Sequence, residues 1–188
     1  MRIDEITVGP VQTCCYILSG DHEEECVVID PGDEPERIRK MAGGRRIAAI
    51  LLTHGHFDHI GGVAPLMGEG TRLAVHPLDE GMLSDPELNA GMGLMRKRIT
   101  APAPTDRVRE GDVLTIAGLT ISVLHTPGHT PGSVCYLVDG ELFTGDTLFE
   151  HGWGRTDLPG GSEHDMYASL RRLLPLMRQY PVHPGHHA

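Results

Sequence analysis

The sequence lacks any long run of apolar residues. Its longest such run, residues 47–52, has the length of a buried strand and falls far short of the roughly 20 residues that span a bilayer. The chain begins with M-R-I-D-E, which is acidic and contains no apolar stretch of the kind found in a signal peptide. We therefore expect a cytoplasmic protein.

Positive charge is also scarce. The chain has 16 Lys and Arg against 26 Asp and Glu, which gives a formal net charge of -10 with neutral histidines. Such a chain repels the phosphates of nucleic acid and the anionic headgroups of lipids. We expect a small-molecule substrate, and neither a nucleic acid nor a membrane as a partner.

Cysteine is sparse, whereas histidine is abundant. The four cysteines, Cys14, Cys15, Cys26 and Cys135, form no C-x-x-C pair, and the two adjacent ones are poorly placed for a local disulfide, so reduced core thiols are expected. The chain has 12 histidines, and many of them crowd into three short stretches flanked by Gly, Thr and Asp. Histidines in such surroundings indicate metal binding.

The length of 188 residues suits one domain with a sizeable core, so residues 1–188 are predicted to form a single domain. Short apolar stretches bounded by Gly and Pro predict strands at 3–8, 14–18, 26–29, 47–52, 72–75, 113–116, 119–124, 133–138, 141–144 and 180–183. Helices are predicted at 34–41, 61–67, 78–83 and 165–177, the last interrupted by Pro175, with a partly helical connection and candidate lid at 84–104. Two β-rich halves, each ending in helix, predict an α/β fold with two sheets face to face and helices outside, in four layers.

The strongest motif is T-H-G-H-F-D-H at 53–59, which directly follows the apolar strand 47–52. Alternate residues of an extended chain share a face, so His54 and His56 are placed to hold one ion. If the chain begins to coil at the next residues, Asp58 and His59 turn towards a second ion. These ligands are too few for two complete sites, so later loops must supply more.

Three later loops offer the missing ligands. His129, in H-T-P-G-H-T-P-G at 125–132, lies between glycines and prolines that allow a close approach, whereas His125 at the strand end is expected to pack or to support the site. Asp146 follows the strand 141–144, and a carboxylate there suits two ions held about 3.5 to 4 Å apart, because each oxygen can serve one of them. His186 follows Pro-Gly after the last strand and is the preferred ligand there.

The order of these motifs resembles the metallo-β-lactamase superfamily, and within it the glyoxalase II (hydroxyacylglutathione hydrolase)-like branch. The resemblance spans nearly the whole chain and implies an αββα sandwich with two divalent metal ions. It also implies that Asp30, in the turn after strand 26–29, supports the histidine loop from behind. It assigns ligands to both ions: His54, His56 and His129 to the first, Asp58, His59 and His186 to the second, and Asp146 with a hydroxide as bridges.

The chain departs from glyoxalase II in ways that bear on the substrate. That family carries an additional C-terminal helical region that helps to hold glutathione, and this region is missing here. Where the family has a Lys and a Tyr that bind glutathione, the segment 152–157 has Arg155 and Asp157, which keeps a basic group and loses the phenol. Relatives usually have Gly after the final P-G-H, where this chain has His187, and whether His183 or His187 can replace His186 stays open.

The expected reaction is hydrolysis of a thioester. Two dications lower the pKa of a bound water towards about 7, so a hydroxide between them is the expected nucleophile, with Asp58 orienting it or accepting its proton. No ligand is an obvious acid for a leaving group, which suits a thiolate, since its pKa is only about 8.5. Arg155 is a candidate for binding a substrate carboxylate. His and Asp ligands accept Zn, Fe or Mn, and we favour Zn.

The nearest alternative is a persulfide dioxygenase. That family resembles this chain in G-R-T-D at 154–157 and uses one iron, which His54, His129 and Asp146 would hold here. Its terminal motif is usually P-A-H-D, whereas this chain has P-G-H-H, and this difference favours the hydrolase. A nuclease is disfavoured by the acidic charge, a flavodiiron-type oxygen reductase by the histidine found where that class usually has Glu, and a non-catalytic metal-binding protein by the complete ligand set.

Overall fold

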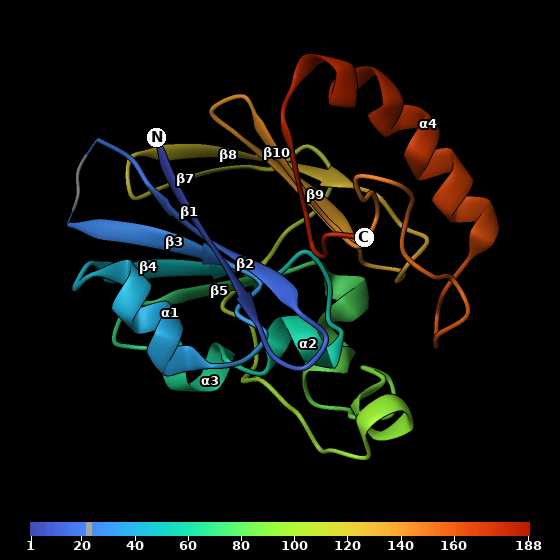
Figure 1. Ribbon diagram of the computed structural model, residues 1–188, viewed down its shortest axis with the longest axis horizontal. Helices are drawn as coiled ribbons and strands as arrows, with labels where there is room; N and C mark the ends of the chain where they lie inside the picture. Colours follow the sequence, from blue (N-terminus) through green and yellow to red (C-terminus); the bar gives the residue numbers. More distant parts are fainter. Residues whose placement is uncertain (22–23) are drawn as a thin grey trace.

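The computed structural model describes residues 1–21 and 24–188, which form two β-sheets packed face to face (Figure 1). The N-terminal sheet has the strand order β1-β2-β3-β4-β5-β6, and the C-terminal sheet has the order β11-β10-β9-β8-β7. The strands of the N-terminal sheet are β1 (Arg2–Val8), β2 (Thr13–Ser19), β3 (Glu25–Ile29), β4 (Arg46–Leu51), β5 (Arg72–Val75) and β6 (Asp106–Arg107). Those of the C-terminal sheet are β7 (Val113–Ile116), β8 (Leu119–His125), β9 (Val134–Val138), β10 (Glu141–Gly145) and β11 (Val182–Pro184).

The N-terminal sheet begins as an antiparallel meander and continues as a parallel sheet. β1, β2 and β3 pair antiparallel, whereas β4 pairs parallel with both β3 and β5. The crossover from β3 to β4 is α1 (Pro35–Ala42), which begins with a proline and ends at Gly43 in the left-handed conformation. The carboxyl ends of β3 and β4 therefore lie side by side, and the loops after them meet.

Tight turns and one long helix shape the C-terminal sheet. Ala117-Gly118 and Asp139-Gly140 join antiparallel strands, and all four residues have positive φ, as a type I′ turn requires. α4 (Glu163–Gln179) begins at Ser162, whose hydroxyl accepts a hydrogen bond from the backbone N–H of Asp165. After α4 the chain returns as β11, parallel to β10.

Three apolar clusters separate the layers. The largest lies between the two sheets and includes Tyr16 and Tyr136. A second packs the other face of the N-terminal sheet under α1 and α3 (Val63–Leu66), and a third, with Leu173, packs the C-terminal sheet under α4. Figure 1 shows α1 and α3 on one outer side and α4 on the other. The predicted four-layer αββα sandwich is confirmed.

The structure corrects several local predictions. The predicted helix 61–67 is α3, preceded by the short α2 (Phe57–Ile60), and the predicted helix 78–83 is the 3-10 helix η1 (Pro77–Leu83). In the connection 84–104, the regular part is the π-helical turn η2 (Gly91–Met95). α4 continues through Pro175, which is exposed, so water can satisfy the carbonyl that this proline leaves unpaired. Among the described residues, no helix combines the length and the apolar character needed to cross a bilayer.

Candidate metal centre

The histidine motif follows the buried end of β4. His54 and His56 are almost fully buried, at 1% and 3% exposed. His56 has an extended backbone, and α2 begins at the next residue, which turns Asp58 and His59 to a different side of the site. The change from extended to helical backbone therefore divides one short motif between two groups of side chains.

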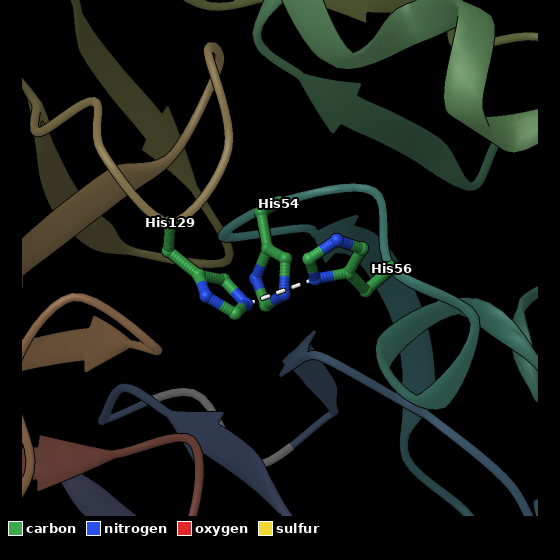
Figure 2. Close-up of side chains that lie close together, drawn as sticks. All are labelled: His54, His56 and His129. Atoms are coloured by element: carbon green, nitrogen blue, oxygen red, sulfur yellow. Dashed lines mark hydrogen bonds between the residues drawn. The ribbon is translucent and has the colours of Figure 1, made fainter. Parts of the chain in front are cut away.

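The first group contains three histidines, His54, His56 and His129 (Figure 2). A ligand nitrogen from each lies within 4.8 Å of those of the other two, and all three rings are buried. His56 Nδ1 lies 2.9 Å from His129 Nε2. The other nitrogen of His129, Nδ1, donates to the carbonyl of Arg155 at 2.7 Å, so its Nε2 faces the group as a lone pair. Three imidazoles from two loops thus converge on one point.

The second group contains Asp58, His59 and His186, again with ligand atoms within 4.8 Å of one another. His186 Nε2 lies 3.2 Å from Asp58 Oδ2, and His59 Nε2 lies 3.3 Å from the same oxygen. The Thr13 hydroxyl, from the start of β2, donates to that oxygen at 2.8 Å. The group therefore joins the first strands of the fold to its last loop.

Asp146 lies between the two groups. Its Oδ1 is 3.3 Å from His59 Nε2, and its Oδ2 is 3.4 Å from both His129 Nε2 and His186 Nε2. It follows Gly145, whose φ is +52° and where a Cβ would lie only 2.4 Å from Thr53 Oγ1. Because only glycine fits there, β10 can bring this carboxylate against the histidine loop.

Asp30 orients His59 directly and His54 through Thr53. Its carboxylate accepts hydrogen bonds from the backbone N–H and hydroxyl of Thr53, at 2.8 and 2.6 Å, and from His59 Nδ1 at 2.9 Å. Because the Thr53 hydroxyl donates its proton to Asp30, it can only accept from His54 Nδ1, which lies 3.0 Å away. In the rings of His54 and His59, Nδ1 therefore carries the hydrogen and donates it, to Thr53 and to Asp30 respectively. The other nitrogen of each ring, Nε2, is turned into the site.

A buried carboxylate that the sequence analysis missed, Asp79, ties the two histidine loops together. It is 0% exposed and accepts hydrogen bonds from the backbone N–H of Gly55 at 3.0 Å, from the Thr130 hydroxyl at 2.6 Å and from the backbone N–H of Gly132 at 2.7 Å. Gly55 lies between His54 and His56, and Thr130 follows His129. Nothing in the surrounding sequence, P-L-D-E-G-M-L at 77–83, distinguishes this aspartate from a solvent-exposed helix residue.

The two groups differ in their charge. Burial holds the pKa of His54 well below its usual value, and burial with a neighbouring imidazole lowers the pKa of His56 to about 3, so both rings are neutral. Burial opposes a charge on His59, but Asp58 and the other nearby carboxylates outweigh it and hold its pKa well above the usual value. Carboxylates likewise outweigh burial at His186 and raise its pKa to about 9. The second group therefore attracts positive charge.

Unsatisfied atoms test whether these residues fit metal ions. Among the described residues, the buried side-chain nitrogen and oxygen atoms without a hydrogen-bond partner are His54 Nε2, His56 Nε2, His59 Nε2 and Asp146 Oδ1. A buried polar atom without a partner is costly, and His54 Nε2, His59 Nε2 and Asp146 Oδ1 belong to residues that meet between the two groups, whereas His56 faces His129 with Nδ1. Imidazole nitrogen and carboxylate oxygen are ligands of divalent ions, so the donor set fits such ions.

A cleft of about 670 Å³ opens beside the two groups. His129, Asp146 and His186 line it together with Arg155 and Phe149. The Arg155 guanidinium is exposed and forms an ion pair with Asp157, with bonds of 2.6 and 2.8 Å. A basic group thus lies at the rim of the cleft, next to the loop whose carbonyl holds His129.

Two other histidines considered from the sequence lie outside these groups. His125 stacks on His76, with ring centroids 4.2 Å apart, and its Nε2 bonds to the carbonyl of Pro131 at 2.9 Å. His183 pairs with Glu141 at 2.7 Å and stacks on Phe143. Both rings have partners elsewhere, and the structure brings His186 rather than His183 to the site.

Comparisons with known proteins show the family. The family model of the metallo-beta-lactamase superfamily matches residues 8–186. The hydroxyacylglutathione hydrolase GloC of Haemophilus influenzae is 36% identical over 196 residues, which cover 99% of this chain and 91% of that protein. The crystal structure of BLEG-1 B3 metallo-beta-lactamase is 38% identical with a TM-score of 0.92, and the match covers 100% of this chain and 92% of that one. TTHA1623 in a di-iron-bound form is 40% identical with a TM-score of 0.85, covering 98% and 92%.

Proposed function

We propose that this chain, which belongs to the metallo-beta-lactamase superfamily of metallo-hydrolases, hydrolyses thioesters in the manner of the hydroxyacylglutathione hydrolases. Members of this superfamily bind divalent metal ions. The observation that carries the proposal is the pair of ligand groups with Asp146 between them, at the wall of an open cleft. The similarity to GloC over nearly the whole of both chains supports the thioester as the substrate class.

The ligands of the proposed centre follow from the two groups. His54, His56 and His129 would hold one ion, Asp58, His59 and His186 would hold the other, and Asp146, which lies between the two groups, would serve both. We propose zinc, and the di-iron form of TTHA1623 makes iron the first alternative. When bound, two such ions lower the pKa of a water molecule and polarise the carbonyl of the substrate.

Asp58 is placed to orient the attacking water and to accept its proton. All contacts described for its carboxylate are made by Oδ2, which faces Thr13, His59 and His186. Among the described residues Oδ1 has no such partner, so it is the oxygen left to accept a hydrogen bond from a water molecule.

The ligands leave no acid for a poor leaving group. Every imidazole and carboxylate of the proposed centre is assigned to a metal, so none enters the reaction already protonated as an acid for a departing alkoxide or amine. A thiolate needs no such help because its conjugate acid has a pKa of only about 8.5. Arg155, at the rim of the cleft, is the group proposed to bind a carboxylate of the substrate.

The test is thiol release from a hydroxyacyl thioester of glutathione by zinc-loaded protein, with the matching oxygen ester as a second substrate. We expect turnover of the thioester, and a loss of about 100-fold or more in kcat/KM for Asp58→Asn and His129→Ala. His164→Ala is the matched control, since His164 is an exposed histidine on α4, and it should retain full activity. Absence of thioester hydrolysis in protein that holds both ions would contradict the proposal.

A second candidate function is oxidation of a persulfide at a single iron. The observation that favours it is the contact of His54, His129 and Asp146, with His129 Nε2 3.4 Å from Asp146 Oδ2, next to the Arg155–Asp157 pair. Elemental analysis of protein expressed with both zinc and iron, without a chelator or a nickel column, separates the two. About two ions per chain with zinc prominent supports the hydrolase. One tightly held iron, with oxygen uptake on addition of glutathione persulfide, supports the alternative.

A further inference from the structure

Three metal-binding side chains lie together outside the proposed binuclear centre. The sulfur of Cys14, a carboxylate oxygen of Glu5 and a ring nitrogen of His187 all lie within 4.8 Å of one another. His187 Nε2 is in direct contact with Glu5 Oε1. None of the three belongs to either group of ligands described above, so the proximity needs its own explanation.

The fold builds this cluster from the two ends of the chain. In the antiparallel pair of β1 and β2, Glu5 is opposite Tyr16, so Cys14 is its diagonal neighbour on the same face. The backbone N–H of Cys14 donates to the carbonyl of Gly185 at 2.7 Å, and the Tyr16 hydroxyl donates to the carbonyl of Pro184 at 2.6 Å. These bonds hold the last loop against β2, and His187 is thereby placed over the thiol.

The chemistry of the cluster is that of a thiophilic cation site. Thiolate, imidazole and carboxylate are the donors that bind zinc and its divalent neighbours. Cys14 is buried at the base of the cluster, whereas the side chains of His187 and Glu5 are 53% and 35% exposed, so an ion can enter from solvent and keep water as a further ligand. Burial and Glu5 raise the pKa of the Cys14 thiol to about 12, so the bound ion would displace a proton to solvent.

We propose that Glu5, Cys14 and His187 form a third metal site, which binds one divalent cation of the zinc class through a thiolate. His187 also lines the cleft beside His186, so an ion held here adds positive charge at the mouth of that cleft. The site differs from the binuclear centre in its ligand chemistry, because the proposed ligands of that centre are nitrogen and oxygen atoms only. Its presence therefore does not depend on what the binuclear centre hydrolyses.

Cobalt(II) provides the test, because a thiolate bound to it gives a charge-transfer absorption band that nitrogen and oxygen ligands do not. Metal-free protein comprising residues 1–188 is titrated with Co(II) while this band and the number of bound ions are measured. We expect the band in the wild-type protein, with one ion bound beyond the proposed pair. It should disappear in Cys14→Ser and remain in Cys135→Ser, the matched control at another fully buried cysteine.

Two surface substitutions keep the test independent of core packing. His187→Ala and Glu5→Gln change exposed side chains, and each should weaken the Co(II) binding seen in the charge-transfer band by about tenfold or more. A wild-type protein that binds Co(II) without the band would overturn the proposal. So would a band that survives Cys14→Ser, or an affinity unchanged by both surface substitutions. Loss of thioester hydrolysis alone bears on the proposed function and leaves this readout unaffected.

Discussion

Replacing Asp79 by Asn tests whether this buried carboxylate holds the two histidine loops in position. Its three hydrogen-bond donors are the backbone N–H groups of Gly55 and Gly132 and the hydroxyl of Thr130. Oδ2 accepts from Gly55 and Thr130, whereas Oδ1 accepts from Gly132. An Asn side chain has one oxygen and one NH2 group, so in either orientation its NH2 group faces one of the two buried backbone N–H groups.

The expected loss of stability follows from the backbone N–H group that is left without an acceptor. A buried donor left without a partner costs about 1–3 kcal/mol. The remaining hydrogen bonds also weaken when the carboxylate loses its charge, but burial raises the pKa of Asp79, so removing the charge also relieves a desolvation penalty. These two effects oppose each other, and we expect Asp79→Asn to lower the free energy of unfolding by about 1–3 kcal/mol.

Urea denaturation of the metal-free protein measures this change, and zinc titration measures its effect on the site. The loops that carry His54, His56 and His129 lose hydrogen bonds to the same carboxylate. The affinity for the ion proposed to bind these three histidines should therefore fall about 10- to 100-fold. Asp85→Asn is the matched control, since the partly exposed Asp85 accepts from the backbone N–H groups of Glu87 and Leu88 through one oxygen, which Asn keeps. Asp79→Asn within about 0.5 kcal/mol of wild type, with unchanged zinc affinity, would refute the reasoning.

Three further predictions concern other parts of the molecule. Tyr16→Phe removes the buried donor to the carbonyl of Pro184, and urea denaturation should show a loss of about 1–3 kcal/mol; an unchanged midpoint would contradict this. Burial lowers the pKa of His76 to about 4, below its value in the unfolded chain, so its contribution to stability is present above about pH 6.5 and is lost as the pH falls towards 4. His76→Asn, which can keep the cap on η1, should flatten this part of a plot of denaturation midpoint against pH, and an unchanged slope would exclude His76 as its source. Arg155→Ala should raise KM for a carboxylate-bearing thioester about tenfold with little change in kcat, whereas an unchanged KM would show that Asp157 keeps the guanidinium from the substrate.

Most of the sheet structure was predictable because its signals are local. Apolar stretches ended by Gly or Pro predict the strands, and pairs such as Asp139-Gly140 predict the turns because few other residues accept positive φ. β6 was missed because its two residues, Asp106 and Arg107, are charged, and their ion pairs with Arg72 and Glu80 are contacts that no local pattern reveals. The resemblance to the metallo-β-lactamase superfamily is confirmed by the family model.

The candidate site was predictable to the extent that its residues cluster in the sequence. The motif at 53–59 and the loop at 125–132 can be recognised by their density of histidine, and the structure brings His54, His56 and His129 together but not His125. Their roles as metal ligands stay a prediction. Asp30 was assigned only through the family resemblance, and Asp79 was not found at all, because the hydrogen bonds of both carboxylates join segments far apart in the chain.

The bond between Tyr16 and Pro184 joins residues that are 168 positions apart in the chain. Closing so large a loop costs conformational entropy before the stabilising contacts have formed. We therefore expect the last loop to dock against β2 late in folding. The three side chains of the first group all lie at or before residue 129, whereas the second group includes His186. During synthesis, the residues of the three-histidine group therefore exist before His186 does, and the proposed binuclear centre would be completed only after His186 has been added to the chain.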